Sequence, residues 1–353
     1  MTEAVGRLVG RDRELERLRA VLGAPTSWPA ALLLEGEAGA GKTALWTAGL
    51  ELARGCRILR ARPTGAEAQL AFSALGDLLE GLGDDALAEL PGLQRRALEA
   101  ALLIGEEEAP DADLRAVAVA VLSVLRRLAA ERPVVLAVDD EQWLDAPTAA
   151  ALTFALRRLR DEPVLVLAAR RTASARAPVS GLAAAFEAGR VQRIAPGPLD
   201  LESLRRVLER ELGVSWTRPV LVRIHATSGG NPLYALELAR ALARGDAAVP
   251  ATLRGLLSER LSRLPTSAVE ALAVAAACDQ PDVTLLAAAM ERDVAADVEA
   301  AAAAGIVVRE GGRIRFAHPL LAAVAHAAAP EPRRREIHRR LAAVLQEPEQ
   351  RAM

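Results

Sequence analysis

Residues 32–46 read LLLEGEAGAGKTALW, an apolar run followed by a glycine-rich loop and the start of a helical pattern. Within this stretch, residues 36–43 fit G-x-x-x-x-G-K-[ST], the motif of a phosphate-binding P-loop. Glycines let successive backbone N–H groups turn toward a phosphate, and the N-terminus of the following helix favours negative charge. The alternative is a Gly/Ala-rich turn that matches by chance, but the strand–loop–helix context favours a P-loop. We therefore predict that ATP or ADP is bound by Gly36, Glu37, Ala38, Gly39, Ala40, Gly41, Lys42, Thr43 and Ala44.

Lys42 is the only lysine among the 44 lysine and arginine residues of the chain. Its ammonium group is a compact charge on a flexible stem, which the planar guanidinium of arginine does not mimic. We expect Lys42 to reach the β- and γ-phosphates and to take part in catalysis. The hydroxyl of Thr43 is expected to bind Mg²⁺.

A pair of carboxylates follows an apolar run at residues 134–138, which reads VVLAV. A P-loop site needs one carboxylate for the metal and a second group that orients water for hydrolysis. We expect Asp139 to bind Mg²⁺ through water and Asp140 to orient the attacking water, with Glu141 as the less favoured alternative. An ordinary acidic loop at the end of a strand is the competing interpretation. Asp145 is expected to be the N-cap of the next helix rather than a catalytic group.

Five short apolar runs predict strands, and longer stretches with helical spacing separate them. Continuous buried strands that alternate with helices indicate a parallel sheet covered on both faces, so the predicted fold class is α/β. About 70 residues, mostly helical, lie between the second and third runs, and they include an acidic loop at 105–112. The runs are 30–34, 56–61, 133–138, 164–168 and 191–194.

After Pro198 the strand signals stop, and we predict three domains: 1–197, 198–249 and 250–353. Asp200 is a plausible N-cap for the helices of the second domain, and a turn interrupts them at 228–232. In the third domain, predicted helices at 252–264, 267–278 and 283–291 precede a hairpin of 306–310 and 313–316. This order is typical of a winged helix. A terminal helix is predicted from residue 333 to about residue 345.

Composition excludes several other classes of protein. The net charge of −2 lacks the basic excess of a dedicated nucleic-acid binder, and the arginines at 333–335 and 339–340 are expected to lie on a solvated helix face. The two cysteines and four histidines have no metal-site or disulfide spacing. The first 20 residues are charged throughout, so we expect no signal peptide and a cytoplasmic protein. The longest uncharged run near the middle, 116–125, is far below the roughly 18 residues of a membrane span.

The fourth predicted strand, which contains the apolar run 164–168, ends at Arg170 and Arg171. Ligands of open α/β sheets bind at the carboxyl ends of strands, so Arg170 could contact a γ-phosphate. Most arginines at a protein surface have no such role. The spacing of Arg170 alone does not decide between a contact with the γ-phosphate and an ordinary surface position.

Several motifs together resemble a known family. In chain order they are residues 9–15 (VGRDREL), the P-loop, 138–145 (VDDEQWLD), 230–233 (GNPL) and 316–320 (FAHPL). They resemble the STAND class of AAA-like signalling ATPases, and within it the ATPase region of the large ATP-binding LuxR-type bacterial regulators. Those regulators normally continue into a helical-repeat sensor and a DNA-binding helix-turn-helix. This chain stops at Met353, so we expect no DNA binding from it.

The resemblance implies a strand order of 5-1-4-3-2, which makes Arg170 a first sensor of the γ-phosphate. It also implies that Val9 and Arg11 line the adenine side and that Pro232 presses on the adenine from a helical lid domain. His318, in the winged-helix domain, would reach the β-phosphate of ADP and latch a closed form. The winged helix would then be a regulatory hinge.

These expectations describe an ATP/ADP switch with slow Mg²⁺-dependent hydrolysis. Exchange of ADP for ATP would break the His318 contact, move the lid and expose a surface for self-association or for a partner protein. Two alternatives stay open. One is a fast-turnover metabolic or remodelling ATPase, and the other is a DNA-binding winged-helix protein with a vestigial P-loop.

Overall fold

The computed structural model describes residues 8–23, 28–82, 87, 89–102, 113–171, 181–244, 251–278, 280–310 and 312–350. The chain forms two compact units, Met1–Gly197 and Pro198–Met353. The loop at 105–112 and the expected domain boundary at 249–250 lie outside the described residues. In the described part of the chain, no helix combines the length and the apolar character that crossing a bilayer would require.

The described residues of the first unit contain a parallel five-stranded sheet in the order β2-β3-β4-β1-β5. This is the order predicted through the resemblance, so that expectation is confirmed. The central strands are almost entirely apolar and buried, as a sheet covered on both faces requires. The strands are β1 (Ala30–Gly36), β2 (Arg57–Ala61), β3 (Val134–Val138), β4 (Val164–Arg171) and β5 (Val191–Ile194).

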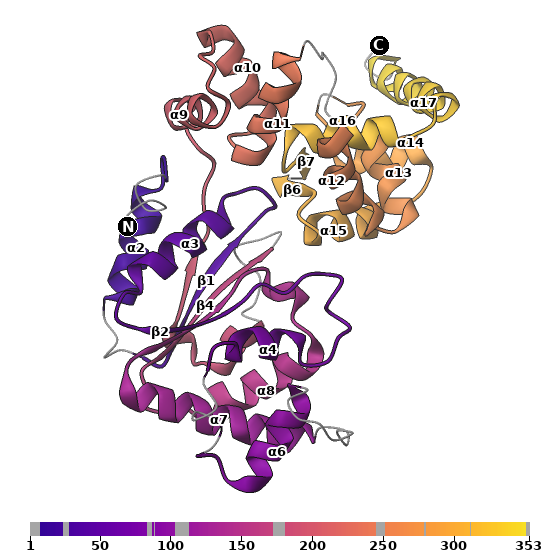
Figure 1. Ribbon diagram of the computed structural model, residues 1–353. Helices are drawn as coiled ribbons and strands as arrows, with labels where there is room; N and C mark the ends of the chain where they lie inside the picture. The colour runs from indigo at the N-terminus through magenta and orange to yellow at the C-terminus, as the bar shows by residue number, and fades with distance from the viewer. Residues whose placement is uncertain are drawn as a thin grey trace. The chain divides into compact units, whose positions relative to one another are not determined.

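Helices cover both faces of this sheet (Figure 1). The side chains of a strand alternate between faces, and Leu32 and Leu34 pack in one apolar cluster while Leu33 packs in another. The first cluster includes α2 (Asp12–Leu22) and α3 (Lys42–Leu52). The second includes α4 (Ser73–Leu79), α6 (Gly92–Ala101), α7 (Leu114–Glu131) and α8 (Ala146–Leu156). The unit is therefore a three-layer α/β/α arrangement.

Asp145 is the N-cap of α8, as predicted, and it also fixes a distant segment. Its side chain, 2% exposed, accepts a hydrogen bond of 2.9 Å from the N–H of Thr148. It also accepts from the N–H groups of Phe72 and Ala74 at 2.9 and 3.2 Å. One carboxylate therefore ties the start of α4 to the start of α8.

We expect Asp145→Ala to lower the free energy of unfolding by roughly 3–5 kcal/mol, because three buried N–H groups lose a charged acceptor. Urea denaturation followed by circular dichroism measures this loss. Asp200→Ala is the matched control, since Asp200 caps α9 (Leu201–Leu212) with one hydrogen bond from Ser203 and its loss should cost about 1 kcal/mol. An equal effect of the two substitutions would contradict the tie between α4 and α8.

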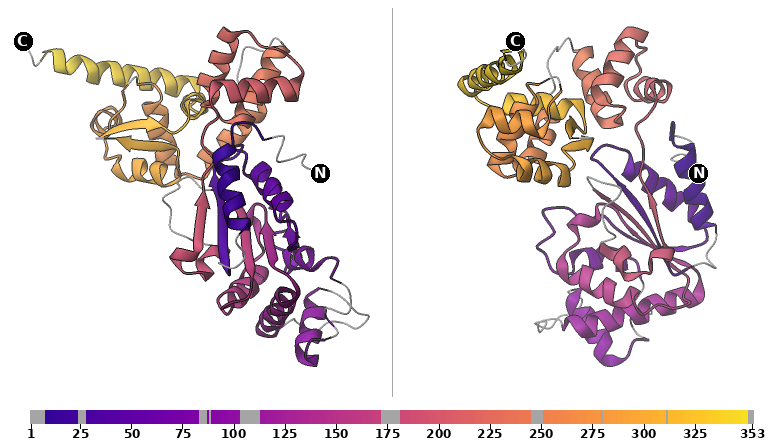
Figure 2. Two further views of the ribbon diagram at one scale, coloured as in Figure 1. Left: turned by 90° about the vertical axis from the view of Figure 1, so that its left-hand side faces the viewer. Right: turned by 180° about the vertical axis from the view of Figure 1, so that it is seen from behind.

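The described residues of the second unit form helices and one hairpin. Its β6 (Val307–Glu310) and β7 (Arg313–Phe316) pair antiparallel, as predicted, and appear as two adjacent arrows in Figure 2. Gly311, part of the predicted turn, lies outside the described residues. The other elements are α9, α10 (Arg218–Ser228), α11 (Pro232–Ala243), α12 (Ala251–Ser262), α13 (Thr266–Ala275), α14 (Val283–Met290), α15 (Ala295–Ala303), α16 (Pro319–Ala328) and α17 (Glu331–Gln350).

Two of these helices, α15 and α16, were not predicted from the sequence. The α15 segment reads AADVEAAAA, which has one bulky apolar residue and therefore little helical periodicity. Alanine nevertheless favours a helix, and Val298 and Ala301 supply a buried face. As a result, the described residues from 251 to 303 hold one helix more than the three expected before the hairpin. The winged-helix assignment stays a prediction.

Candidate functional site

The P-loop joins β1 to α3 with the backbone that its glycines permit. Gly39 and Gly41 have φ angles of 78° and 95°, which L side chains rarely adopt, and Gly41 is the N-cap of α3. Lys42, 7% exposed, is the first residue of the helix, and its ammonium group donates a 2.8 Å hydrogen bond to the carbonyl oxygen of Glu37. The ammonium group therefore folds back over the loop, where the phosphates of a nucleotide would lie.

Thr43 and Asp139 meet at the end of β3. The hydroxyl of Thr43 donates to Oδ1 of Asp139 at 3.2 Å. Burial raises the pKa of Asp139, while the hydrogen bond from Thr43 lowers it. A desolvated carboxylate beside a hydroxyl gains from a hard cation, and Mg²⁺ is commonly held by one or two carboxylates together with substrate phosphates. The two side chains fit Mg²⁺ bound with a nucleotide.

Charges of both signs surround the ammonium group of Lys42. Burial lowers the pKa of Lys42, and the carboxylates of Asp140 and Asp139 act in the opposite direction. The guanidinium of Arg171 also lowers this pKa. The predicted ammonium, hydroxyl and two carboxylates are thus brought to one edge of the sheet.

Asp140 has a strained backbone and a restrained side chain. Its φ of 54° and ψ of 50° place it in the left-handed region, which costs free energy for a residue other than glycine. Its Oδ1 accepts a 2.7 Å hydrogen bond from the amide of Gln142, whose own oxygen accepts from the N–H of Arg171 at 3.1 Å. The side chain of Asp140 is 36% exposed, so water can reach it.

Glu141, the alternative base, is placed differently. It is 6% exposed, and its Oε1 accepts a 2.6 Å hydrogen bond from the N–H of Leu182. Gly181 has a φ of 66°, and a Cβ there would lie 2.5 Å from Oε1 of Glu141. Burial raises the pKa of Glu141. This enclosure makes Asp140 the better placed of the two carboxylates to orient water.

Arg170 lies at the carboxyl end of β4, which extends to Arg171, where the fourth strand was predicted to end. It pairs in register with Glu35 of β1, and its Nε donates to Oε1 of Glu35 at 2.7 Å. Arg193 of β5 donates to Oε2 of the same carboxylate, also at 2.7 Å. Contact of Arg170 with a γ-phosphate stays a prediction.

Glu35 and Arg193 were not predicted from the sequence to belong to the site. The signal was present, since Arg193 is a charged residue within the predicted strand 191–194 and Glu35 directly follows the predicted strand 30–34. Charged groups in such positions are almost always paired, so two of them on different strands indicate a buried ion pair.

Arg11, predicted on the adenine side, contacts the P-loop from outside. It is buried, and its Nη2 donates to the carbonyl oxygen of Ala40 at 2.9 Å while Nη1 donates to that of Gly197 at 2.6 Å. Burial lowers the pKa of Arg11, and Glu14 raises it. Val9 is half-buried two residues earlier. The adenine roles of Val9 and Arg11 stay predictions.

Pro232 and His318 both lie in the second unit. Pro232 is the first residue of α11, after the N-cap Asn231. Nε2 of His318 lies within hydrogen-bond distance of the carbonyl oxygen of Ser228, and Nδ1 accepts from the N–H of Leu320 at 3.1 Å. His318 therefore joins the end of α10 to the start of α16. The expected contacts of Pro232 and His318 with a nucleotide stay predictions.

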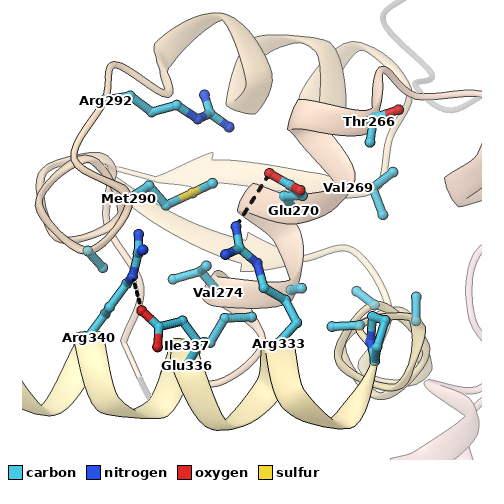
Figure 3. Close-up of a pocket in the computed structure, with 16 residues that line it drawn as sticks. Thr266, Val269, Glu270, Val274, Met290, Arg292, Arg333, Glu336, Ile337 and Arg340 are labelled. Carbon is cyan, nitrogen blue, oxygen red and sulfur yellow. Dashed lines mark hydrogen bonds and ion pairs between the residues drawn. The ribbon is translucent and has the colours of Figure 1, made fainter.

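The second unit also contains a cavity of about 420 Å³ between α13, α14, α16 and α17 (Figure 3). Its wall includes the apolar side chains of Val274, Met290 and Ile337. Arg333 faces Glu270 across it, with 3.7 Å between Nη2 and Oε2. The lining contains neither a glycine-rich loop nor the start of a helix after a strand, so it differs chemically from the P-loop.

Comparison with known proteins agrees with the P-loop fold. Residues 7–167 match the family described as the AAA ATPase domain. The Walker-type ATPase of Pyrococcus abyssi is 16% identical, with coverage of 89% of this chain and 95% of that chain and a TM-score of 0.57. No curated protein gives a significant match.

Two further solved structures are less similar. A Signal Transduction ATPase with Numerous Domains (STAND) protein with a tetratricopeptide repeat sensor from Pyrococcus horikoshii is 14% identical, with a TM-score of 0.39 and coverage of 96% of this chain and 45% of that one. Cdc6p from Pyrobaculum aerophilum is 14% identical, with a TM-score of 0.44 and coverage of 96% and 95%. The resemblance to LuxR-type regulators stays a prediction. The first unit has the α/β fold of a P-loop NTPase, and residues 7–167 are similar to the AAA ATPase domain.

Proposed function

We propose that this chain is an ATP/ADP-binding switch with slow Mg²⁺-dependent hydrolysis, serving as the regulatory ATPase of a signalling or transcriptional regulator. One observation carries the proposal. The Lys42 ammonium group lies over the P-loop, and the Thr43 hydroxyl is hydrogen-bonded to Asp139. The carboxylates of Asp139 and Asp140 both act electrostatically on Lys42. These are the groups that phosphoryl transfer from a nucleotide requires.

Each group has a separate task. The P-loop N–H groups and Lys42 would bind the β- and γ-phosphates, and Thr43 and Asp139 would hold Mg²⁺. When bound, the metal neutralises negative charge on the phosphates and orients them. Asp140 would accept a hydrogen bond from the attacking water, and the contact with Gln142 keeps its carboxylate in place. Arg170 would respond to the γ-phosphate.

The switch itself involves the second unit. We assign residues 198–249 to a helical lid and 250–353 to a winged helix, with Pro232 against the adenine and His318 on the β-phosphate of ADP. His318 suits a latch because it is buried and its Nε2 faces a carbonyl oxygen. A carbonyl oxygen only accepts, so Nε2 is a hydrogen-bond donor, as contact with a phosphate requires. A nucleotide can shift the equilibrium between the two states of the switch only if it makes different contacts in each state. The γ-phosphate is the group that distinguishes ATP from ADP.

The nucleotide bound by the purified protein tests the proposal. The protein is denatured with acid, and chromatography identifies and quantifies the released nucleotide. We expect about one ADP per chain, together with slow steady-state release of phosphate. Rapid multiple turnover without a partner would favour the metabolic or remodelling ATPase instead.

The DNA-binding alternative loses support from the charges of α17. Four of its arginines are in ion pairs: Arg333 with Glu270, Arg335 with Glu331, and Arg339 and Arg340 with Glu336. Binding of a DNA duplex that weakens with salt and is unaffected by Lys42→Ala would revive it. Self-association or a partner protein in the ATP state is the interaction that the switch predicts.

A further inference from the structure

One buried carboxylate holds two arginines at the base of the P-loop. Glu35 is 1% exposed and lies in β1, directly before Gly36, where the phosphate-binding loop begins. Arg170 uses both Nε and Nη2 on Oε1 of Glu35. Arg193 uses Nε on Oε2 at 2.7 Å and Nη2 on Oε1 at 3.2 Å.

The two arginines compete for this carboxylate. Oε1 accepts hydrogen bonds from both guanidinium groups, so the charge of Glu35 is divided between them. A second carboxylate forms a longer ion pair with Arg170, since Oε2 of Glu141 lies 3.9 Å from its Nη1. Because Glu35 and Arg170 are buried, their interaction is screened less than that of a surface ion pair.

The position of Arg170 links its bonds with Glu35 to the binding of a phosphate. The register between β1 and β4 places Arg170 opposite Glu35, and thus at the carboxyl edge of the sheet where ligands of this fold bind. Nε and Nη2 of Arg170 already donate to Glu35, so turning them toward a phosphate weakens these bonds. The free energy of those bonds is therefore subtracted from any attraction between Arg170 and a γ-phosphate.

We propose that Glu35 is a positioning residue that sets how strongly the chain prefers ATP to ADP, and that Arg193 adjusts this preference by sharing the carboxylate. Glu35 restrains Arg170, and Arg193 weakens the restraint. ADP has no γ-phosphate, so the competition affects ATP alone. This inference rests on the proposed function, because it requires that the P-loop binds both nucleotides.

Two substitutions in the same cluster then have opposite effects. Glu35→Gln removes the charge that restrains Arg170, so the preference for ATP should rise by about tenfold, the scale of one charge-assisted hydrogen bond. Arg193→Gln leaves the whole carboxylate to Arg170, so the preference should fall, by about three- to tenfold on the same scale. If both residues only supported the fold, the two substitutions would act on the ratio in the same direction or not at all.

The test measures dissociation constants for ADP and for a non-hydrolysable ATP analogue, both with Mg²⁺, by calorimetry on the full chain. The quantity compared is the ratio of the two constants in wild type, Glu35→Gln and Arg193→Gln. Arg170→Gln completes the set, because in that background Glu35→Gln should no longer change the ratio. Thermal unfolding without nucleotide shows which variants are folded. If Glu35→Gln fails to fold, Arg193→Gln still tests the inference, because Glu35 keeps Arg170 as a partner in that variant. The direction in which Arg193→Gln changes the ratio then decides.

Ratios that move in opposite directions support the inference. Ratios that stay unchanged or move together overturn it while leaving the proposed function intact, provided that wild type binds both nucleotides and Lys42→Ala does not. Absence of nucleotide binding in wild type overturns the proposed function itself, and this inference with it.

Discussion

Replacement of Lys42 by alanine should weaken binding of both ATP and ADP by at least about 100-fold. The ammonium group lies over the P-loop, within hydrogen-bond distance of the Glu37 carbonyl oxygen, and no other lysine exists in the sequence to replace it. Hydrogen bonds between charged partners contribute roughly 1.5–3 kcal/mol each, and Lys42 is expected to make two of them with phosphates. Calorimetry with Mg·ATP and with ADP measures the loss.

Lys42→Arg is the matched control for charge. It retains a cation but replaces a compact ammonium group with a planar fork in a buried position, so we expect it to recover only part of the affinity. Both variants should remain folded, because burial lowers the pKa of Lys42 and the apo protein gains little from burying the charge. Wild-type affinity in Lys42→Ala would show that the nucleotide does not bind at this loop.

The second large effect concerns hydrolysis. Asp140→Asn should retain nucleotide affinity within a few-fold and lower the rate of ATP hydrolysis by about 100-fold or more, because the amide no longer accepts a proton from water. The exposed carboxylate and its left-handed backbone favour this role. Single-turnover release of phosphate from prebound ATP measures the chemical step separately from product release.

Glu141→Gln separates the two candidate bases. Glu141 is enclosed and accepts a hydrogen bond from the N–H of Leu182, and burial raises its pKa. Neutral glutamine should therefore be tolerated, with hydrolysis within a few-fold of wild type. A loss of hydrolysis in Glu141→Gln, with normal rates in Asp140→Asn, would transfer the role to Glu141.

Much of the first unit could be predicted from local sequence. The motif at residues 36–43 requires glycines whose φ values are positive, and the structure has them at Gly39 and Gly41. Asp145 could be identified as an N-cap because the side chain of an Asp before a helix accepts a hydrogen bond from a free N–H group of the first turn. Its bonds to Phe72 and Ala74 could not be predicted, since they join segments more than 70 residues apart.

The sequence by itself determined that a phosphate-binding loop lies between a buried strand and a helix, and that two carboxylates follow another strand. These features depend on residues next to one another in the chain. Only the tertiary structure decided that Arg170 and Arg193 share the buried carboxylate of Glu35. The strands β1, β4 and β5 come from distant parts of the chain, and their register places the charges together. A buried charge must have a partner, but which residue becomes that partner depends on how the strands pair.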